Sequence, residues 1–527
     1  MNDLPWRSRA RLGVLLGILA AGALAGCGDD DDGGGNVAGS PSSGGASGAG
    51  QSGNGGTGGV SGASGAGGAS GAGGAGGAGG AGGAGGAGGA GGASGGGAGG
   101  LGGGGAGGGA TGVGFDPTFG EQGVVEIEAI QHNHALFRTL GVDAQSRIYV
   151  GGVREEALLA RLLPDGSLDP SFGQGGVVKP GHSDFYGDFM RPQPTGQVFL
   201  AGDNYQSGGL LTFLHLNADG SPDLAFGNGG VAAPPFPFGN AYTTLSDLGT
   251  WGDRLVALGF SNASEESSSG LFVLRLRADG SRDPSFGGPG GIVFYKPSLP
   301  AFFSAYAAAS TMRVRADGSM LLVGAGYLRQ AESDPPDGSD CFLLRMGADG
   351  VPDPSLDGDG ALYVAARSED NLDYNLTSCS TVDEGPDGSI VLGGQVARPY
   401  DSNGDGEGSD FVIMRRLPDG SPDLAFAQQG IFVLHVGRAD SILGVIAAPD
   451  GSIVAVGKTD NRPIVIKLLP NGALDTSFQG GGIFYERDRY LPAEAFARQP
   501  DGKLLVGGGV TSATFDQQPF VARLFAP

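Results

Sequence analysis

The stretch Arg161-Leu162-Leu163-Pro164-Asp165-Gly166-Ser167-Leu168-Asp169-Pro170-Ser171-Phe172-Gly173 recurs in varied copies along this chain of 527 residues. Copies of its second aspartate follow one another at intervals of 52 to 70 residues. These aspartates are Asp116, Asp169, Asp223, Asp283, Asp353, Asp423 and Asp475. A period of this length indicates one supersecondary unit that has been copied along the chain.

The residues between successive copies of the motif predict four short strands per repeat. In the sixth repeat, apolar and β-branched segments cover residues 431–436, 441–447, 453–457 and 463–469. A Pro-Asp-Gly-Ser turn separates the second of these segments from the third. Short strands joined by such turns are typical of an antiparallel meander. No segment of useful length after residue 115 has a helical period.

The strand pattern therefore predicts an all-β fold, a seven-bladed β-propeller of four-stranded antiparallel blades. A parallel β-solenoid is the alternative. Its coils are usually shorter, and it would not show the hairpin turns.

The two ends of the repeat array complement each other. In every interior joint a basic residue precedes the aspartate by eight positions, as Arg161 precedes Asp169. Arg523 has no aspartate after it, and Asp116 has no basic residue before it. A ring needs this arrangement if its last blade is completed by the N-terminal strand, whereas an open solenoid would need polar caps. We expect Asp116 and Arg523 to meet, and deletion of residues 115–127 to destabilise the domain strongly.

The motif Arg-Leu-x-x-Asp-Gly-Ser-x-Asp-x-x-Phe-Gly resembles the delta-60 repeat family of bacterial β-propeller-like units. The resemblance covers residues 116–527, with departures: Leu356 and Asp357 replace Phe-Gly, and Ala427 and Gln479 replace the glycine. It implies a propeller-like fold and carries over no catalytic residue. Because the basic residue, the aspartate and the phenylalanine recur in the blades, we interpret them as structural fasteners and inter-blade packing.

The first 26 residues have the features of an export signal. A basic region with Arg7, Arg9 and Arg11 precedes an apolar run at 12–24 that is too short to span a bilayer. Leu24-Ala25-Gly26-Cys27 resembles a bacterial lipobox, so we expect residues 1–26 to be removed and Cys27 to be lipidated. This predicts a lipoprotein exported through the inner membrane and anchored in the bacterial envelope, at the outer membrane or the cell surface.

Residues 27–114 consist almost entirely of glycine, alanine and serine after a run of aspartates. With so few large side chains, this segment cannot offset the entropy of ordering, which predicts a disordered linker. The propeller is expected to occupy residues 115–527.

The chain is acidic, with a formal net charge of −24. This disfavours nucleic acid as a partner and permits divalent cations or basic partners, although acidity also serves solubility alone. Cys341 and Cys379 are the cysteines other than Cys27. In an exported protein they can form a disulfide, and two buried thiols are the alternative.

An acidic insertion at 401–410 supplies the candidate cofactor site. Its Asp-x-Asn-x-Asp-Gly pattern matches the first half of a calcium loop, but Val412 stands where an EF-hand has its bidentate glutamate. A weaker calcium site and a solvated acidic loop both remain open. The expected ligands are Asp401, Asn403, Asp405, Glu407 and Asp410. His132 and His134 share a strand face, but nothing else in the sequence supports a metal site there.

These features predict a non-enzymatic binding or scaffold module, held at a membrane by its lipid, that binds a protein or glycan through loops at one end of the ring. The alternative is a propeller enzyme acting on glycans, a hydrolase or lyase with carboxylates in the central channel. No catalytic residue is assigned.

Overall fold

The computed structural model describes a series of segments between residues 114 and 525. They are 114–128, 132–133, 136–153, 157–180, 185–204, 210–236, 242–262, 270–295, 305–328, 340–364, 377–397, 408–487, 489–511 and 516–525. The chain divides into two units, Met1–Gly109 and Ala110–Pro527, and every described residue belongs to the second. The expected signal peptide, Cys27 and nearly all of the expected linker lie outside the described residues.

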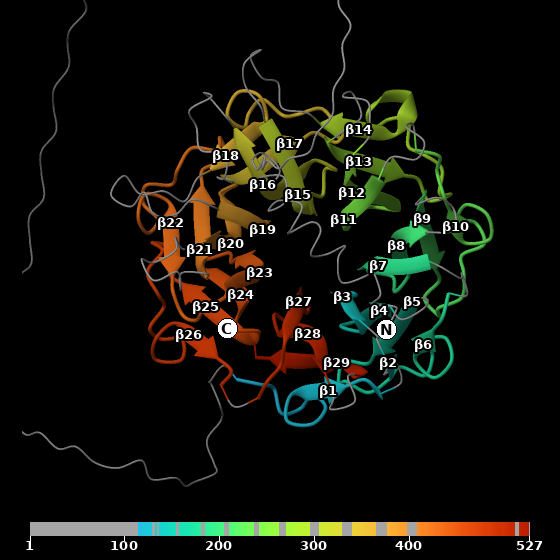
Figure 1. The fold of residues 1–527 in the computed structure, drawn as a ribbon, viewed down its shortest axis with the longest axis horizontal. Coiled ribbons are helices and arrows are strands. Elements are labelled where there is room, and N and C mark those ends of the chain that lie inside the picture. Colours follow the sequence, from blue (N-terminus) through green and yellow to red (C-terminus); the bar gives the residue numbers. More distant parts are fainter. Residues whose placement is uncertain are drawn as a thin grey trace, which may run out of the picture. The chain divides into compact units, whose positions relative to one another are not determined.

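Seven antiparallel sheets form a ring in the second unit (Figure 1). The first blade contains β3 (Leu136–Val142), β4 (Ile148–Val153), β5 (Ala157–Leu162) and β6 (Val177–Val178). The second contains β7 (Phe185–Pro192), β8 (Val198–Asn204), β9 (Leu210–Leu216) and β10 (Val231–Ala232). The third contains β11 (Tyr242–Trp251), β12 (Arg254–Asn262), β13 (Gly270–Leu276) and β14 (Ile292–Tyr295), with a 3₁₀ helix, η3 (Gly288–Gly290), before β14.

The remaining blades follow the same order. The fourth contains β15 (Ala305–Val314), β16 (Met320–Leu328), β17 (Asp340–Met346) and β18 (Ala361–Val364). The fifth contains β19 (Thr377–Glu384), β20 (Ile390–Ala397), β21 (Ser409–Arg416) and β22 (Ile431–Leu434). The sixth contains β23 (Asp440–Ala447), β24 (Ile453–Thr459), β25 (Arg462–Leu468) and β26 (Ile483–Tyr485). The prediction of a seven-bladed propeller of four-stranded antiparallel blades is confirmed.

The seventh blade joins the two ends of the propeller sequence. It contains β27 (Ala493–Arg498), β28 (Leu504–Thr511) and β29 (Asp516–Leu524), and its outer strand is the N-terminal β1 (Val124–Glu126). β1 pairs antiparallel with β29, with Val125 opposite Val521. The two-residue β2 (His132–Asn133) also pairs with β29. In Figure 1, β1 lies beside β29 although they stand at opposite ends of the repeat array.

One part of the sequence interpretation is wrong: the grouping of strands into blades. The segment expected to open the sixth unit, here β22, pairs with β21, with Ile431 opposite Met414. It therefore closes the fifth blade. The long connection after β21 contains the Asp-Gly turn and folds back beside the strand it left, so the repeat and the blade are offset by one strand.

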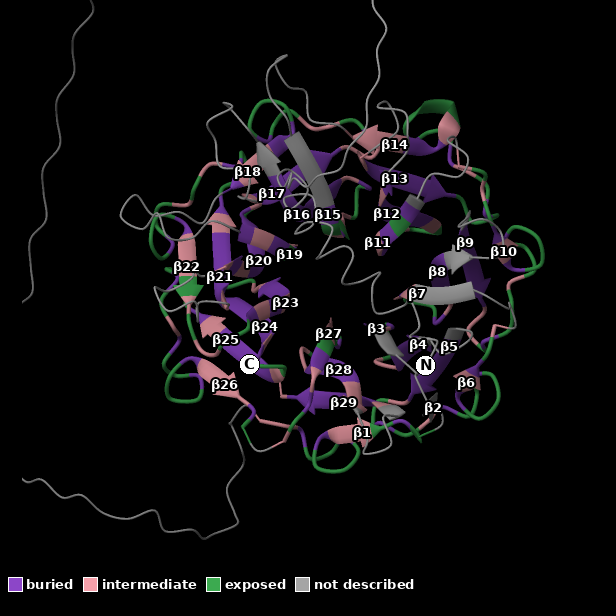
Figure 2. Ribbon diagram, viewed as in Figure 1, coloured by how far each residue is buried: buried purple, intermediate pink, exposed green. Residues whose placement is uncertain are grey.

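The core consists of seven layers, each lying mainly between two neighbouring blades. Phe199 and Phe213 of the second blade, for example, pack in one cluster with Leu255 and Phe272 of the third. Central strands are buried on both faces, as in β13 and β17 (Figure 2). Continuous apolar strands are expected when both sides of a sheet are covered. No helix among the described residues is long and apolar enough to cross a membrane.

Candidate functional site

The two ends of the ring differ in the regularity of their strand connections. One end, called here the turn end, carries the connections from first to second strand and from third to fourth strand of each blade. Six of the seven first connections have five residues, and five of the six third connections within blades have fourteen. These segments contain the Asp-Gly turns, such as Asp165-Gly166 and Asp450-Gly451.

The opposite end, called here the variable end, carries the second-to-third connections and the crossings between blades. The second-to-third connections range from two residues, Asp460 and Asn461, to eleven residues at 329–339 and 398–408. The second of these connections contains most of the acidic insertion at 401–410, and the first is also acidic, with Glu332, Asp334 and Asp337. Both connections thus begin and end at the variable end, in neighbouring blades. The repeat is constant at one end of the ring and divergent at the other.

The recurrent basic residue and aspartate hold the turn end together. Arg161 Nε lies 2.8 Å from Asp169 Oδ2, and the guanidinium stands 4.4 Å from the centre of the Phe172 ring. The same guanidinium donates to the carbonyl oxygen of Ala218 in the next blade. Arg275 repeats this arrangement with Asp283, Phe286 and the carbonyl of Ala348 in the fourth blade. These residues are inter-blade fasteners, as the sequence predicted.

A backbone hydrogen bond accompanies the fasteners. The residue after the phenylalanine donates its N–H to the carbonyl of the turn Asp or Asn in the next blade, as Gly173 does to Asp219 at 2.8 Å. Gly173 has a φ of 56°, in the left-handed region that favours glycine. Asp357, Ala427 and Gln479 occupy this position in other joints and keep a φ near 50°. The joint therefore preserves its backbone even where the sequence departs from glycine.

Asp116 and Arg523 are brought together at the seventh joint. Arg523 Nη2 lies 2.9 Å from Asp116 Oδ2, with both side chains nearly fully buried. Arg523 also donates to the Pro164 carbonyl of the first blade and stands 4.6 Å from the Phe119 ring centre. This contact set copies the interior joints.

The environment of Asp116 favours its ionised form. Burial opposes ionisation, but hydrogen bonds from the Thr118 hydroxyl and N–H, together with Arg523 and Lys503, hold the pKa of this carboxyl below its ordinary value of 3.8. The charge pair that closes the ring is therefore present at neutral pH.

Cys341 of β17 and Cys379 of β19 form a disulfide between the fourth and fifth blades, with their Cα atoms 5.1 Å apart. Cys341 lies beside the base of the insertion at 329–339, because β17 begins at Asp340. The bond ties two neighbouring blades near the variable end.

The expected calcium ligands are only partly visible. Asp401, Asn403, Asp405 and Glu407 lie outside the described residues. Asp410, at the start of β21, is 2 % exposed. It lies near His435 and Asp440, which the sequence interpretation did not select.

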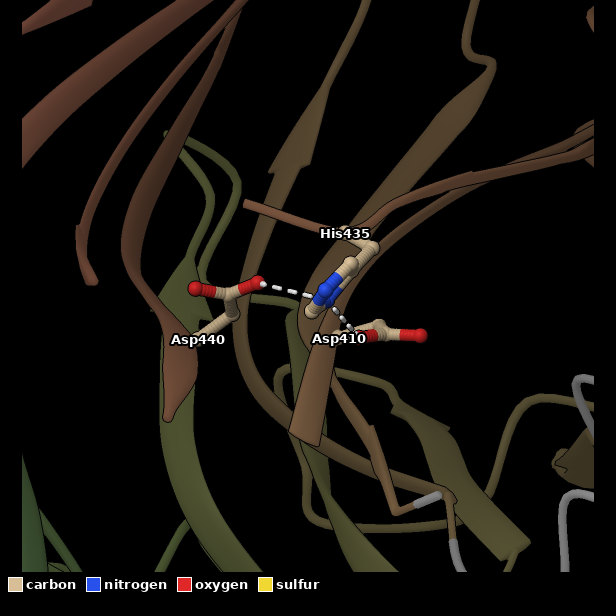
Figure 3. Close-up of side chains that lie close together, drawn as sticks. All are labelled: Asp410, His435 and Asp440. Carbon is tan, nitrogen blue, oxygen red and sulfur yellow. Dashed lines mark hydrogen bonds and ion pairs between the residues drawn. The ribbon is translucent and has the colours of Figure 1, made fainter. Parts of the chain in front are cut away.

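Within the described part of the chain, one group of three side chains could hold a metal ion: Asp410, His435 and Asp440 (Figure 3). His435 Nδ1 lies 2.9 Å from Asp410 Oδ1 and 4.0 Å from Asp440 Oδ2. One ligand atom from each residue lies within 4.8 Å of the others. The cluster sits at the variable end, where β21 begins, β22 has just ended and β23 begins.

The local backbone positions Asp440. The crossing from the fifth to the sixth blade has five residues, and its Val436 and Gly437 N–H groups donate to the Asp440 carboxylate at 2.8 and 3.0 Å. Ser409 Oγ donates to the Asp440 carbonyl oxygen at 2.7 Å. Asp440 is fully buried, whereas the side chain of His435 is 56 % exposed. The cluster therefore has a buried, hydrogen-bonded inner side and one solvent-accessible side.

Two cavities open at the turn end. One, of about 250 Å³, lies between the first connections of the fifth and sixth blades and includes Asp387, Arg415 and Asp450. The other, of about 490 Å³, includes Asp143, Pro192 and Gln499 of three neighbouring blades. Both are lined largely by repeat turns, so we assign them no separate chemistry.

Four segments of the chain match the model of a family described as "Domain of unknown function (DUF5122) beta-propeller". The matches cover residues 146–172, 253–286, 448–478 and 499–526. The first three end at the fastener phenylalanines Phe172, Phe286 and Phe478. The family model thus matches a second strand, a third strand and the joint that follows. No curated protein matches the chain.

Several solved structures are similar to this chain over about three quarters of its length. A polysaccharide lyase, PL25 ulvan lyase, is 10 % identical over 74 % of this chain and 95 % of its own, with a TM-score of 0.44. The RRP9 WD40 repeats are 8 % identical over 76 % and 97 %, with a TM-score of 0.41. A protein of unknown function from Dyadobacter fermentans DSM 18053 is 14 % identical over 77 % and 100 %, with a TM-score of 0.35. At these values the similarity carries no argument about function.

Proposed function

We propose that this protein is an exported, lipid-anchored propeller that acts as a non-enzymatic binding or scaffold module in the bacterial cell envelope. The partner is a protein or a glycan, and it binds at the variable end. In the same proposal, the repeats are of the delta-60 type and Cys27 carries the lipid.

The observation that carries the binding role is the contrast between the two ends of the ring. Connections at the turn end keep nearly constant lengths because they form the joints between blades. Connections at the variable end change from two to eleven residues without changing the fold. Loops of varied length on a rigid scaffold are a common basis for specific recognition.

The chain offers its own short turn for a test of this role. Asp460 and Asn461 connect β24 to β25, and Thr459 pairs with Arg462 across the turn. Likewise Ala397 pairs with Ser409, and Gly326 with Asp340. Replacing residues 398–408 and residues 327–339 each by Asp-Asn therefore joins strand positions that already face each other. The second replacement also removes Tyr327 and Leu328, the last two residues of β16.

Cross-linking in intact cells, followed by purification of the full chain, measures partner capture. We expect capture by the wild type and by the turn-end variant Asp253→Asn. We expect loss of the partner from the loop-shortened variant, which should still unfold cooperatively. Equal capture by the loop-shortened variant would contradict binding at the variable end. Depolymerisation of a glycan by the purified wild type would favour the enzyme instead.

The anchor is tested separately by metabolic labelling with an alkyne fatty acid. We expect label in the wild type and none in Cys27→Ser, which should also leave the membrane fraction. Label that persists in Cys27→Ser would contradict lipidation at this cysteine.

A further inference from the structure

We infer that Asp410, His435 and Asp440 bind one divalent transition-metal ion, such as Zn²⁺, between the fifth and sixth blades. The site does not depend on the proposed binding role, because it follows from described side chains alone. It also differs in ligand chemistry from the calcium loop expected in the sequence.

The two distances from His435 Nδ1 to the carboxylate oxygens are close to the spacing that such an ion requires, and all three ligand atoms lie within 4.8 Å of one another. Bonds of about 2.0–2.1 Å in a tetrahedral site place neighbouring ligand atoms about 3.3 Å apart. His435 Nδ1 lies 2.9 Å from Asp410 Oδ1 and 4.0 Å from Asp440 Oδ2, on either side of this value. Small movements of side chains would therefore complete three ligands, with a fourth position facing the accessible side of His435.

The charges of the cluster favour a cation. Asp410 and Asp440 are 2 % and 0 % exposed, so two carboxylates lie buried within a few ångströms of one imidazole. Burying like charges together is costly unless a cation or hydrogen bonds offset them. A divalent ion bound by both carboxylates would neutralise the pair.

A buried hydroxyl beside the cluster points to the same conclusion. Thr459 is fully buried, and its Oγ1 has no hydrogen-bond partner among the residues that the structure describes. Thr459 is the cross-strand partner of Asp440, so the two side chains leave the same face of the sheet. A Cβ atom added to Gly437, whose N–H binds the Asp440 carboxylate, would lie only 2.3 Å from Thr459 Oγ1. The hydroxyl therefore lies beside the backbone that orients the Asp440 carboxylate, where a polar partner would satisfy it.

Backbone hydrogen bonds already orient one ligand of the cluster, as hydrogen bonds to metal ligands do in many sites. The N–H groups of Val436 and Gly437 fix the Asp440 carboxylate before an ion arrives. Ser409, next to Asp410, is bonded to the Arg438 carbonyl and to the Asp440 carbonyl. The ligands from β21 and β23 are thus joined by direct contacts between the two blades.

The imidazole decides the class of metal. Calcium prefers six to eight oxygen ligands, whereas imidazole nitrogen with carboxylate oxygen suits zinc and its neighbours. An ion here would tie the crossing at 435–439 to the base of the insertion at 398–408. It would thereby stiffen one side of the variable end.

Titration of the full chain with Co²⁺ alone, followed by visible absorption, tests the site, and calorimetry with Zn²⁺ alone gives the affinity. We expect one ion per chain and the absorption of a four- or five-coordinate Co²⁺ site. His435→Gln and Asp410→Asn should each weaken binding at least about tenfold. Asp253→Asn, which removes an exposed carboxylate at the turn end, should bind like the wild type.

Because His435 is half exposed, His435→Gln should fold without metal, and its metal-free melting temperature is the control for Asp410→Asn. Absence of binding, or equal affinity in the wild type and both ligand variants, would overturn the site. Displacement of Co²⁺ by an equal concentration of Ca²⁺ would overturn the assignment to a transition metal.

Discussion

Replacing Asp116 and Arg523 by alanine, singly and together, tests whether the two ends of the propeller sequence meet in solution. The side chains of Asp116 and Arg523 are 1 % and 5 % exposed, and Arg523 Nη2 lies 2.9 Å from Asp116 Oδ2. Asp116→Ala also removes the ion pair with Lys503 at 3.3 Å and two hydrogen bonds from Thr118. Arg523 would stay buried beside Phe119 without its carboxylate.

The expected cost follows from this burial. Removing one partner of a buried ion pair destabilises a protein by about 3–5 kcal/mol, because the other charge remains uncompensated. We expect a loss of this size for Asp116→Ala. In the double variant the two losses should not add, and we expect a coupling free energy of about 1–3 kcal/mol.

The sixth joint provides a matched control. Lys467 Nζ lies 3.3 Å from Asp475 Oδ2, and these side chains are 22 % and 11 % exposed. Partly exposed pairs contribute about 0–1 kcal/mol, and the hydrogen bonds from Ser477 add about 1 kcal/mol each. Asp475→Ala should therefore cost clearly less than Asp116→Ala.

Urea unfolding followed by far-UV circular dichroism and by the fluorescence of Trp251 measures these free energies. Trp251 suits the assay because its indole donates to the Ala316 carbonyl of the next blade. Zero coupling between Asp116 and Arg523, or equal losses in Asp116→Ala and Asp475→Ala, would refute the closed ring as the state in solution.

Three further predictions concern the joints and the disulfide. Burial raises the pKa of Asp283, but hydrogen bonds from Ser285 and Arg254 and the charge of Arg275 outweigh it and lower the pKa to about 2 from 3.8. The stability that this group contributes is therefore complete above pH 3.8 and is lost as the pH falls towards 2. In thermal unfolding at a series of pH values, the melting temperature of Asp283→Asn should fall less at acid pH than that of the wild type. Equal falls in melting temperature would contradict the assignment. The disulfide Cys341–Cys379 closes a loop of 38 residues, so its reduction should lower the free energy of unfolding by about 4 kcal/mol. Urea unfolding with and without reductant measures this difference. A double alanine variant should not respond to reductant, and a wild type that is equally insensitive would contradict a stabilising bond. Gly173→Ala should lower the free energy of unfolding by more than about 1 kcal/mol, because the added Cβ would lie 2.3 Å from the Val177 carbonyl oxygen at a φ of 56°. Ala427→Gly, at the same position of another joint, should not lower the melting temperature. Equal effects of the two substitutions would refute the backbone argument.

The blade architecture was predictable because the repeat encodes backbone requirements. Asp-Gly turns and the fastener motif recur at fixed distances, and each sets a turn or a joint that the fold needs seven times. The strand grouping was wrong for a related reason. A linear motif shows where strands begin and end, but only the hydrogen-bond register shows that β22 pairs with β21 rather than with β23.

The cluster at Asp410 was not predictable from the sequence in the same way. Asp410, His435 and Asp440 stand in three strand-end positions, and no local spacing connects them. His435 is one of five histidines in the chain and follows an ordinary apolar strand. Its one signal is that it interrupts the repeat at the first position of the five-residue crossing at 435–439. This signal becomes informative only when the structure shows that β21 pairs with β22 and that Asp440 begins β23 in the next blade.

The joints also explain why function is better sought at the variable end. At the turn end, arginine, histidine and lysine all serve as the basic partner. Glycine, aspartate and alanine all stand after the phenylalanine position, yet each donates the backbone bond to the next blade. A feature that survives such changes is a requirement of the ring rather than of a ligand. At the variable end the described contacts between the fifth and sixth blades come instead from residues that occur once: Ser409 binds the Arg438 and Asp440 carbonyls, and His435 links Asp410 to Asp440. Contacts that are not repeated around the ring are not needed to close it. Their side chains can therefore bind an ion and hold the neighbouring loops.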